Sequence, residues 1–453
     1  MRGEFHREIM QFPSDFYFGV ATSSYQIEGA VAEDGRGESI WDRFTATPGA
    51  VKDGSTGAVA CDHYHRYIED VALMKWLGVN AYRFSTAWPR ILPTGSGKVN
   101  SAGLDFYDRL VDALLNAGIT PFVTLYHWDL PQALQDKGGW TNRDTAFAFA
   151  DYAGVVLERL GDRVKYWMTH NEPWVAAFLG NYFGLHAPGW RDLNAALQVA
   201  HHMLLSHGLV VPQIQAAGGQ AGIAPNLVPA QPASSSPADL AAVQRHDEYI
   251  NRWFLDPVAG QGYPQKMWDY YGAAVPKVGA DDMKIIAAPV DFLGINYYNR
   301  RIAADNPGGK PPQVRSVEDP SKPRTLDREI YPSGLYDILT RIHREYNFPA
   351  LYITENGAAV EEEVTNNRVD DSQRTQFLRD HFVQAARAVS DGVPLRGYFV
   401  WSLMDNFEWA LGYTLRYGIV RVDYDSLIRT PKDSASWYRT FITEQRAEVN
   451  EKS

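Results

Sequence analysis

The sequence predicts an α/β fold, a (β/α)8 or TIM barrel that forms one domain over residues 1–453. Three observations predict it. Short apolar runs rich in β-branched and aromatic residues recur along the chain, and longer segments with helical periodicity separate them. Strands that alternate with helices pair in parallel, and eight such units with continuous apolar strands favour a closed barrel over an open sheet. No linker divides the chain, so we expect a single domain.

The predicted strands are eight short apolar runs, each of a length typical for strands in globular proteins. They are residues 16–22, 79–85, 120–127, 164–170, 221–227, 290–298, 350–355 and 395–401.

The segments between the strands have the helical period. In residues 62–78 the apolar side chains fall on one face of a helix, and this face consists of Tyr64, Tyr67, Ile68, Val71 and Met74. Asp62 can cap the start of this helix and Gly78 can end it. Residues 101–118 repeat the arrangement and end at Gly118, with an apolar face made of Leu104, Tyr107, Val111 and Leu114.

Two segments are too long for simple connections. Residues 228–240 follow the fifth strand, and residues 303–325 follow the sixth; both are rich in Pro, Gly and Ser. Loops after the strands of a barrel surround its active site. They are therefore candidate rim or lid elements, although for residues 228–240 a variable surface loop is an equal alternative.

The composition narrows the class of partner. The chain has 45% hydrophobic and 21% charged residues, which is ordinary for a soluble globular protein, but also 13 Trp and 25 Tyr. Surplus aromatic residues often line ligand grooves, including those for sugars. The formal net charge of −11 argues against a nucleic-acid partner. The single cysteine, Cys61, has no internal partner, so we expect a small buried hydrophobe in a reducing compartment.

The start of the chain has charges spread through it and lacks the apolar run of a signal peptide. No apolar run of about 18 residues occurs elsewhere, which argues against a membrane span. We therefore expect a cytoplasmic protein without a membrane partner.

Polar and aromatic residues gather where the predicted strands end, which is where a barrel holds its active site. In chain order they are Gln26, Arg83, His127, Trp128, Asn171, Glu172, Asn296, Tyr298, Glu355, Trp401, Glu408 and Trp409. Amides and carboxylates bind hydroxyl groups, and indole faces stack on the apolar face of a pyranose. The sequence has no Walker loop, dinucleotide fingerprint or HExxH motif, so we expect no cofactor and no metal.

Each of these residues also has a structural interpretation. Trp401 and Trp409 taken singly suit a core, and Arg83 suits an ion pair inside the barrel. His201, His202 and His207 suggest a metal, but they lie on a predicted helix without a carboxylate at ligand spacing, so packing is favoured.

The two glutamates at strand ends are harder to explain as solvated loop charges. Glu172 and Glu355 each follow an apolar strand, and Asn and Tyr residues flank them. A functional pair is the better interpretation.

At these residues the sequence resembles glycoside hydrolase family 1, the retaining β-glucosidase and β-galactosidase type. The similarity runs nearly end to end. The motifs that carry it are FPSDFYFGVATSSYQIEGA, YRFSTAWPRILP, YHWDLPQAL, THNEPW, DFLGINYY, YITENGA and WSLMDNFEWALGYTLRYGIVRVDY.

The resemblance implies that Glu172 is the acid/base and Glu355 the nucleophile of a double displacement through a covalent glycosyl-enzyme. It also implies a set of glycone-binding residues around the sugar hydroxyls: Gln26, His127, Trp128, Asn171, Glu408 and Trp409, with Trp401 as a sugar platform. Arg83, Asn296 and Tyr298 would surround the nucleophile and the sugar. Trp174 and Leu179 match positions that narrow the aglycone entrance.

The environments of the two glutamates are expected to differ. Arg83 and Tyr298 would favour an ionised Glu355, whereas burial and the negative neighbour would raise the pKa of Glu172. One departure from the family pattern is His170, which stands where an apolar residue is more common. It either alters the pKa of Glu172 or simply packs.

The substrate class that this resemblance implies is the unphosphorylated terminal β-D-glucoside, including oligosaccharides from cellulose, with β-galactosides and β-fucosides left open. Two alternatives remain. A 6-phospho-β-glycosidase would carry Ser and a Lys-x-Tyr pattern after the eighth strand, where this chain has Glu408 and Trp409. A sugar-binding protein without activity would have lost Glu172 or Glu355. The oligomeric state stays open.

Overall fold

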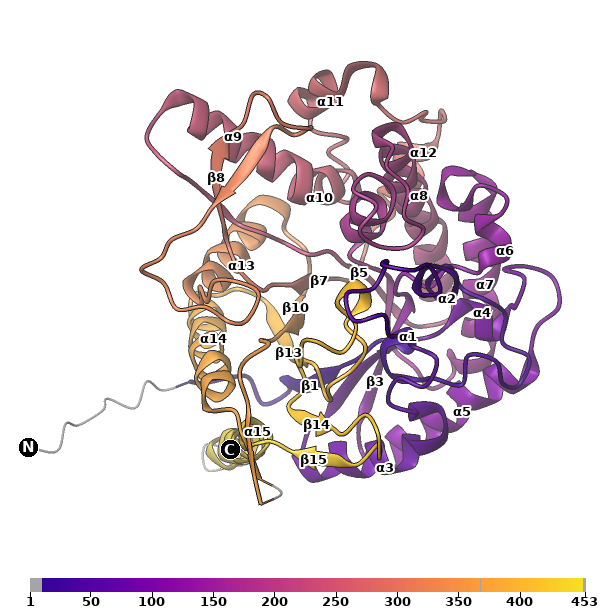
Figure 1. Ribbon diagram of the computed structural model, residues 1–453, viewed down its shortest axis with the longest axis vertical. Helices are drawn as coiled ribbons and strands as arrows, with labels where there is room; N and C mark the ends of the chain where they lie inside the picture. Colours follow the sequence, from indigo (N-terminus) through magenta and orange to yellow (C-terminus); the bar gives the residue numbers. More distant parts are fainter. Residues whose placement is uncertain (1–9, 367, 451–453) are drawn as a thin grey trace, which may run out of the picture.

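The computed structural model describes residues 10–366 and 368–450, and its centre is a closed barrel of eight parallel strands (Figure 1). The strands pair around the ring in the order β1-β13-β10-β7-β5-β4-β3-β2. Their bounds are β1 (Tyr17–Ala21), β2 (Ala81–Ser85), β3 (Thr120–Tyr126), β4 (Tyr166–Asn171), β5 (Gln220–Ala224), β7 (Phe292–Asn296), β10 (Leu351–Asn356) and β13 (Leu395–Trp401). The predicted barrel fold is confirmed.

Each predicted strand is present: β13 has the predicted bounds, and the ends of the others are shifted by up to three residues. The largest difference is β5, which ends at Ala224 rather than at residue 227. Pro225 follows directly and has no N–H to donate to a neighbouring strand, which explains the early end. Strands β4 and β10 run one residue further than predicted, to Asn171 and Asn356.

Seven long helices in the described residues surround the barrel, and most neighbouring helices contact one another around the ring (Figure 1). They are α3 (His63–Leu77), α5 (Ser101–Asn116), α7 (Asp144–Leu160), α8 (Leu193–Ala216), α13 (Ser333–Tyr346), α14 (Ser372–Ser390) and α15 (Asp433–Asn450). Shorter helices lie in the connections: α1 (Ser24–Ile27), α2 (Ile40–Thr45), α4 (Trp88–Ile91), α6 (Gln132–Gln135), α9 (Pro237–Asp247), α10 (Trp253–Val258), α11 (Gln265–Tyr271) and α12 (Asp282–Ile286). No described helix is both long and apolar enough to cross a lipid bilayer.

Two details of helix α3 differ from the prediction. Ile68 is 59% exposed, so it does not belong to the buried face that Tyr64, Val71 and Met74 form. Asp62 precedes the helix, but its carboxylate contacts the His65 ring instead of a backbone N–H. In α5 the predicted face is buried as expected.

The two long segments after the fifth and sixth barrel strands are ordered and pair with each other. Strand β6 (Ala230–Pro232) lies beside β8 (Arg301–Asp305), which pairs with β9 (Val314–Val317) in a separate three-stranded sheet. Helix α9 packs against β8 at the periphery of the molecule (Figure 1). Two further small sheets join β11 (Glu363–Thr365) to β12 (Arg368–Asp370) and β14 (Val420–Val422) to β15 (Arg429–Pro431).

Aromatic side chains fill the barrel at the amino ends of its strands. Phe122 stacks on Tyr166 with ring centroids 4.2 Å apart, and Phe399 meets Phe122 edge to face at 4.8 Å. Tyr17 and Tyr352 complete this cluster. The interior of the barrel is therefore filled by side chains below the carboxyl ends of its strands. Cys61 lies in another part of the core and is fully buried, as predicted.

Candidate active site

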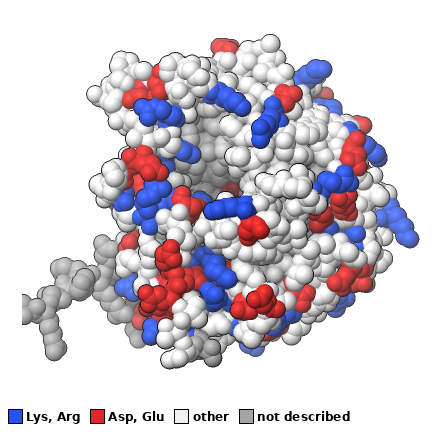
Figure 2. All heavy atoms as spheres, in the orientation of Figure 1, with Lys and Arg blue, Asp and Glu red and all other residues white. Residues whose placement is uncertain are grey.

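Glu172 and Glu355 line one cavity of about 280 Å³ at the carboxyl end of the barrel. Glu355 lies within β10, whereas Glu172 directly follows β4 and takes a left-handed backbone conformation with φ of 43°. Both side chains are buried, at 7% and 4% exposure. Figure 2 shows a hollow in the face of the molecule that Figure 1 presents.

Two donors hold the carboxylate of Glu355. Arg83 Nη1 donates to Oε1 at 2.7 Å, and the Tyr298 hydroxyl donates to Oε2 at 2.7 Å. Burial raises the pKa of Glu355, while the positive charge of Arg83 and these hydrogen bonds act in the opposite direction. The ionised form of Glu355 therefore has a partner on each oxygen.

The carboxyl group of Glu172 has one hydrogen-bond donor, whereas that of Glu355 has two. Asn296 Nδ2 donates to its Oε1 at 2.8 Å. Burial, followed by the negative charge of Glu355, raises the pKa of Glu172 to about 8. At neutral pH the proton of the pair therefore resides on Glu172, and its environment differs from that of Glu355 in the predicted direction.

Asn171 connects the residues around the two carboxyl groups. Its Oδ1 accepts from Arg83 Nη2 at 2.6 Å and from Asn296 Nδ2 at 3.0 Å. Its Nδ2 lies 3.0 Å from His127 Nε2, which must accept. His127 is fully buried, and burial keeps the pKa of its ring well below the usual range. The neutral ring then carries its proton on Nδ1, an atom without a partner among the described residues.

Glu408 and three tryptophans form another wall. Trp409 packs on Trp128 with centroids 4.6 Å apart, and Trp401 stacks on His127 at 5.9 Å. Burial raises the pKa of Glu408 to about 8. A carboxyl group beside indole rings that line the same cavity provides the polar and apolar contacts that a pyranose requires.

The remaining predicted residues lie at different depths. Gln26 is fully buried behind the wall, and its Nε2 lies 3.4 Å from Glu408 Oε2. Leu179 lines the cavity, whereas Trp174 packs against Phe178 and Tyr249 and is not among the lining residues.

The histidines outside the cavity that the sequence analysis singled out are buried and hydrogen-bonded. His170 Nε2 lies 2.7 Å from Ser206 Oγ, and its ring stacks on Phe149, so it packs against helices and does not touch Glu172. On α8, His201 pairs with Asp282 at 2.8 Å and His207 with Thr169 at 2.7 Å. Within the described residues no group of three potential ligands is arranged for a metal ion.

Sequence reasoning missed several lining residues. Asn226 follows the fifth barrel strand, so its position at a strand end was a signal that could have identified it. Arg328 and Tyr417 also line the cavity. Arg328 lies in a connection without a recognisable motif or period, whereas Tyr417 lies within the motif WSLMDNFEWALGYTLRYGIVRVDY and could have been identified from it. His186 is contributed by the segment after β4.

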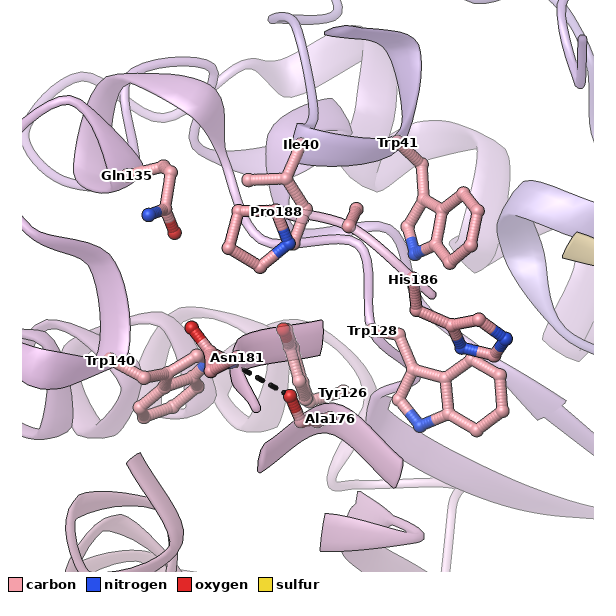
Figure 3. A pocket seen from close by; sticks show the side chains of 11 residues that line it. Ile40, Trp41, Tyr126, Trp128, Gln135, Trp140, Ala176, Asn181, His186 and Pro188 are labelled. Atoms are coloured by element: carbon pink, nitrogen blue, oxygen red, sulfur yellow. Dashed lines mark hydrogen bonds between the residues drawn. The ribbon is translucent and has the colours of Figure 1, made fainter. Parts of the chain in front are cut away.

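A second, much smaller chamber of about 10 Å³ lies behind Trp128 and His186, which line both spaces (Figure 3). Trp41 and Gln135 belong to its lining, and the Trp41 indole nitrogen is buried without a hydrogen-bond partner in the described part of the chain. The chamber therefore has the size and polarity for about one water molecule. The chamber lies on the side of Trp128 that faces away from the catalytic cavity.

The comparisons with known proteins agree with this arrangement. The model of the family described as glycosyl hydrolase family 1 matches residues 8–447. Beta-glucosidase A of Acetivibrio thermocellus is 48% identical over 438 residues, which cover 95% of this chain and 98% of the relative.

Two solved structures are similar over nearly the whole chain. The AHE enzyme from Alicyclobacillus herbarius has a TM-score of 0.93 and 55% identity, covering 97% of this chain and 100% of that one. The family 1 β-glucosidase from Thermotoga maritima has a TM-score of 0.94 and 48% identity, covering 96% and 99%.

Proposed function

The chain belongs to glycosyl hydrolase family 1, and from this we propose that it is a retaining β-glucosidase whose catalytic carboxyl groups are Glu172 and Glu355. The observation that carries the assignment of roles is the difference between the two environments. Glu355 accepts from Arg83 and Tyr298, whereas Glu172 has a pKa raised to about 8.

The reaction proceeds in two displacements. Glu355 attacks the anomeric carbon while Glu172 gives its proton to the departing glycosidic oxygen, and a glycosyl ester forms on Glu355. Glu172, now ionised, removes a proton from water, which attacks the same carbon from the face that the aglycone left, while the bond to Glu355 breaks and its carboxylate is released. The two inversions restore the β configuration.

The residues around the carboxyl groups hold the sugar in this proposal. His127 lines the cavity beside Asn171, to which its Nε2 is hydrogen-bonded. Glu408 takes hydroxyl groups of the glycone, Gln26 supports Glu408, and Trp401 and Trp409 supply apolar faces. Asn296 positions Glu172 through its Nδ2. Leu179 lies on the aglycone side.

We propose terminal unphosphorylated β-D-glucosides as the main substrates, with β-galactosides and β-fucosides as secondary ones. Cello-oligosaccharides fit this class, since hydrolysis at the non-reducing end needs only one sugar unit in the cavity. Action in the cytoplasm is part of the proposal, and the single buried cysteine is compatible with a reducing compartment.

The stereochemistry of the released sugar tests the mechanism. NMR of early time points with 4-nitrophenyl β-glucoside should show β-glucose first and the α-anomer only after mutarotation. Initial release of the α-anomer would rule out retention.

Glu355→Ala tests the nucleophile. The variant should remain folded and lose hydrolysis, yet transfer glucose from α-glucosyl fluoride to an added acceptor, because the small side chain leaves room for this donor. Glu361→Ala is the matched control, since Glu361 is exposed and lies outside the cavity. Near-normal hydrolysis by Glu355→Ala would place the nucleophile elsewhere.

A further inference from the structure

Arg328 contributes a positive charge to the wall of the catalytic cavity and has no place in the reaction described above. It lies between β9 and α13, in the connection that follows the sixth barrel strand. Its side chain lines the same cavity as Glu172 and Glu355 and retains 30% of its accessible surface. A partly accessible guanidinium on a cavity wall is available to a ligand.

The hydrogen bonds of Arg328 use only one edge of the guanidinium. Nε and Nη2 donate to Asp327 Oδ2 at 2.7 and 2.5 Å, and Nη2 also donates to the Tyr417 hydroxyl at 2.8 Å. Nη1 has no hydrogen-bond partner among residues 10–366 and 368–450. A guanidinium carries five N–H donors, so the two on Nη1 remain for a ligand.

The position of this group is fixed before any ligand arrives. The guanidinium carbon lies 4.7 Å from the centroid of the Tyr298 ring, a cation–π distance. Asp327 is itself held, because its Oδ2 accepts from Tyr417 at 2.6 Å and its Oδ1 from Thr325 at 2.9 Å. A pre-arranged donor loses little side-chain entropy when it binds.

We place Arg328 on the aglycone side of the cavity. Its side chain keeps 30% of its accessible surface, whereas Glu172 and Glu355 are at most 7% exposed, so Arg328 lies nearer the opening than the two carboxyl groups. Glu408 and Trp409 occupy the glycone wall in the proposed function, so the departing group must lie toward the rim. Aliphatic side chains line the cavity as well, and they are Val175, Leu179, Leu227, Val228 and Leu411.

We propose that Arg328 selects aglycones that are arenecarboxylates, with the aromatic ring against the aliphatic side chains and the carboxylate on Nη1. The proposal rests on the β-glucosidase function and names a substrate class for it. Asp327 offsets part of the charge of Arg328, but the free Nη1 donors still form charge-assisted hydrogen bonds, which are stronger than neutral ones.

The test compares 4-carboxyphenyl β-D-glucoside with 4-carbamoylphenyl β-D-glucoside, which has nearly the same shape and no charge. The measured quantity is the ratio of their kcat/KM values in the unmodified enzyme and in Arg328→Gln. The ratio should fall at least about tenfold in the variant, as expected for loss of a hydrogen bond to a charged group. Using the ratio cancels the different leaving-group abilities of the two phenols.

Two variants serve as comparisons. Arg396→Gln removes an exposed arginine at the other end of the barrel and should leave the ratio unchanged. Arg328→Lys keeps the charge without the planar fork and should give an intermediate ratio. Should Arg328→Gln fail to fold, the unmodified enzyme still tests the proposal, because 4-hydroxybenzoate should then inhibit it more strongly than 4-hydroxybenzamide.

Three outcomes overturn the proposal. One is an unchanged ratio in Arg328→Gln, and another is equal inhibition by the acid and the amide. The last is a decrease in kcat/KM for 4-nitrophenyl β-glucuronide in Arg328→Gln that exceeds the decrease in the ratio for the carboxyphenyl and carbamoylphenyl glucosides. This result would mean that Arg328 binds an anion on the sugar and not on the aglycone. In each case hydrolysis of 4-nitrophenyl β-glucoside with retention would leave the proposed function intact, whereas its absence would remove both.

Discussion

At the scale of single residues, burial determines the protonation of three carboxyl groups in one cavity. Burial raises the pKa values of Glu172, Glu355 and Glu408, and only Glu355 has an arginine bonded to it. In the proposed mechanism the ion pair with Arg83 is what distinguishes Glu355, the nucleophile, from Glu172, the acid.

The decrease of kcat/KM at alkaline pH should report the deprotonation of Glu172. The acid works only when protonated, so kcat/KM for an alkyl glucoside should be retained below pH 8 and lost as the pH rises through about 8. In Glu172→Gln this decrease should disappear, measured with 2,4-dinitrophenyl β-glucoside, which needs no proton. A decrease that persists in the variant would belong to another group, with Glu408 as the first candidate.

Glu172→Gln should also separate substrates by leaving group. Alkyl glucosides should lose about 10² to 10⁴ in kcat/KM, whereas glycosylation by the dinitrophenyl glucoside should be nearly spared. Added azide should accelerate turnover of the activated substrate and give β-glucosyl azide. Equal losses on both substrates would contradict the acid/base role.

The proposed role of Glu408 includes the choice between glucosides and their 6-phosphates. Its pKa near 8 means that it gains its charge as the pH rises through this value, and a phosphate dianion is then repelled. Above pH 8 the ratio of kcat/KM for 4-nitrophenyl β-glucoside over its 6-phosphate should exceed about a hundred, because like charges in the site cost several kcal/mol, and it should fall as Glu408 becomes protonated at lower pH. A better rate with the phosphate would contradict the role of Glu408.

At the scale of secondary-structure elements, close backbone packing joins the ends of β10 and β13. Gly357 follows β10 directly, and a Cβ added there would lie 1.6 Å from the carbonyl oxygen of Trp401, the last residue of β13. Glu355 and Trp401 stand on either side of this contact, so the packing of the two strand ends sets the site geometry.

Gly357→Ala should therefore reduce both stability and activity. Overpacking of this kind costs about 1–3 kcal/mol of unfolding free energy, measured by urea denaturation, and kcat should fall as Glu355 is displaced. The control is Gly308→Ala, where an added Cβ meets no atom within 4 Å. A Gly357→Ala enzyme with normal stability and kcat would show that the strand ends adapt freely.

The sequence predicted the elements whose signals are local. Apolar runs gave all eight barrel strands, and residues at strand ends gave about half of the residues that line the cavity. Ile68 was assigned to the buried face of α3 because the predicted face was extended too far around the helix. The pairing of β6 with β8 was not predicted because it joins segments about 70 residues apart. Arg328 was missed because its position depends on Asp327, Tyr298 and Tyr417, which are brought together only by the fold.

At the scale of the whole molecule, a buried network of charges holds the last helix to the barrel. Lys432 directly precedes α15, and its Nζ lies 2.7 Å from Asp405 Oδ1, with both side chains fully buried. Arg416 pairs with the other oxygen of Asp405 at 2.6 Å. Burial opposes the charge of Asp405, but Lys432, Arg416 and Arg374 outweigh it and hold its pKa below the usual value.

Lys432→Met should destabilise the protein by about 3–5 kcal/mol at neutral pH, because it leaves a buried carboxylate with one cation fewer. A carboxyl group whose folded pKa is depressed stabilises the fold above its unfolded pKa, and this stability is lost as the pH falls. The deficit of the variant should therefore shrink toward acid pH in thermal unfolding. A deficit that stays constant down to pH 3 would contradict the role of Asp405.

The aromatic cluster of Phe122, Tyr166 and Phe399 closes the barrel beneath the cavity. Substrate and products must then pass through the same opening of the cavity. In the proposed arrangement, the glucose unit lies at the bottom of this cavity. The aglycone has to depart before glucose can, so products leave in a fixed order. Free glucose should therefore be a competitive inhibitor. An alcohol that binds in the opening of the cavity should react with the glycosyl-enzyme in place of water and form a new glycoside.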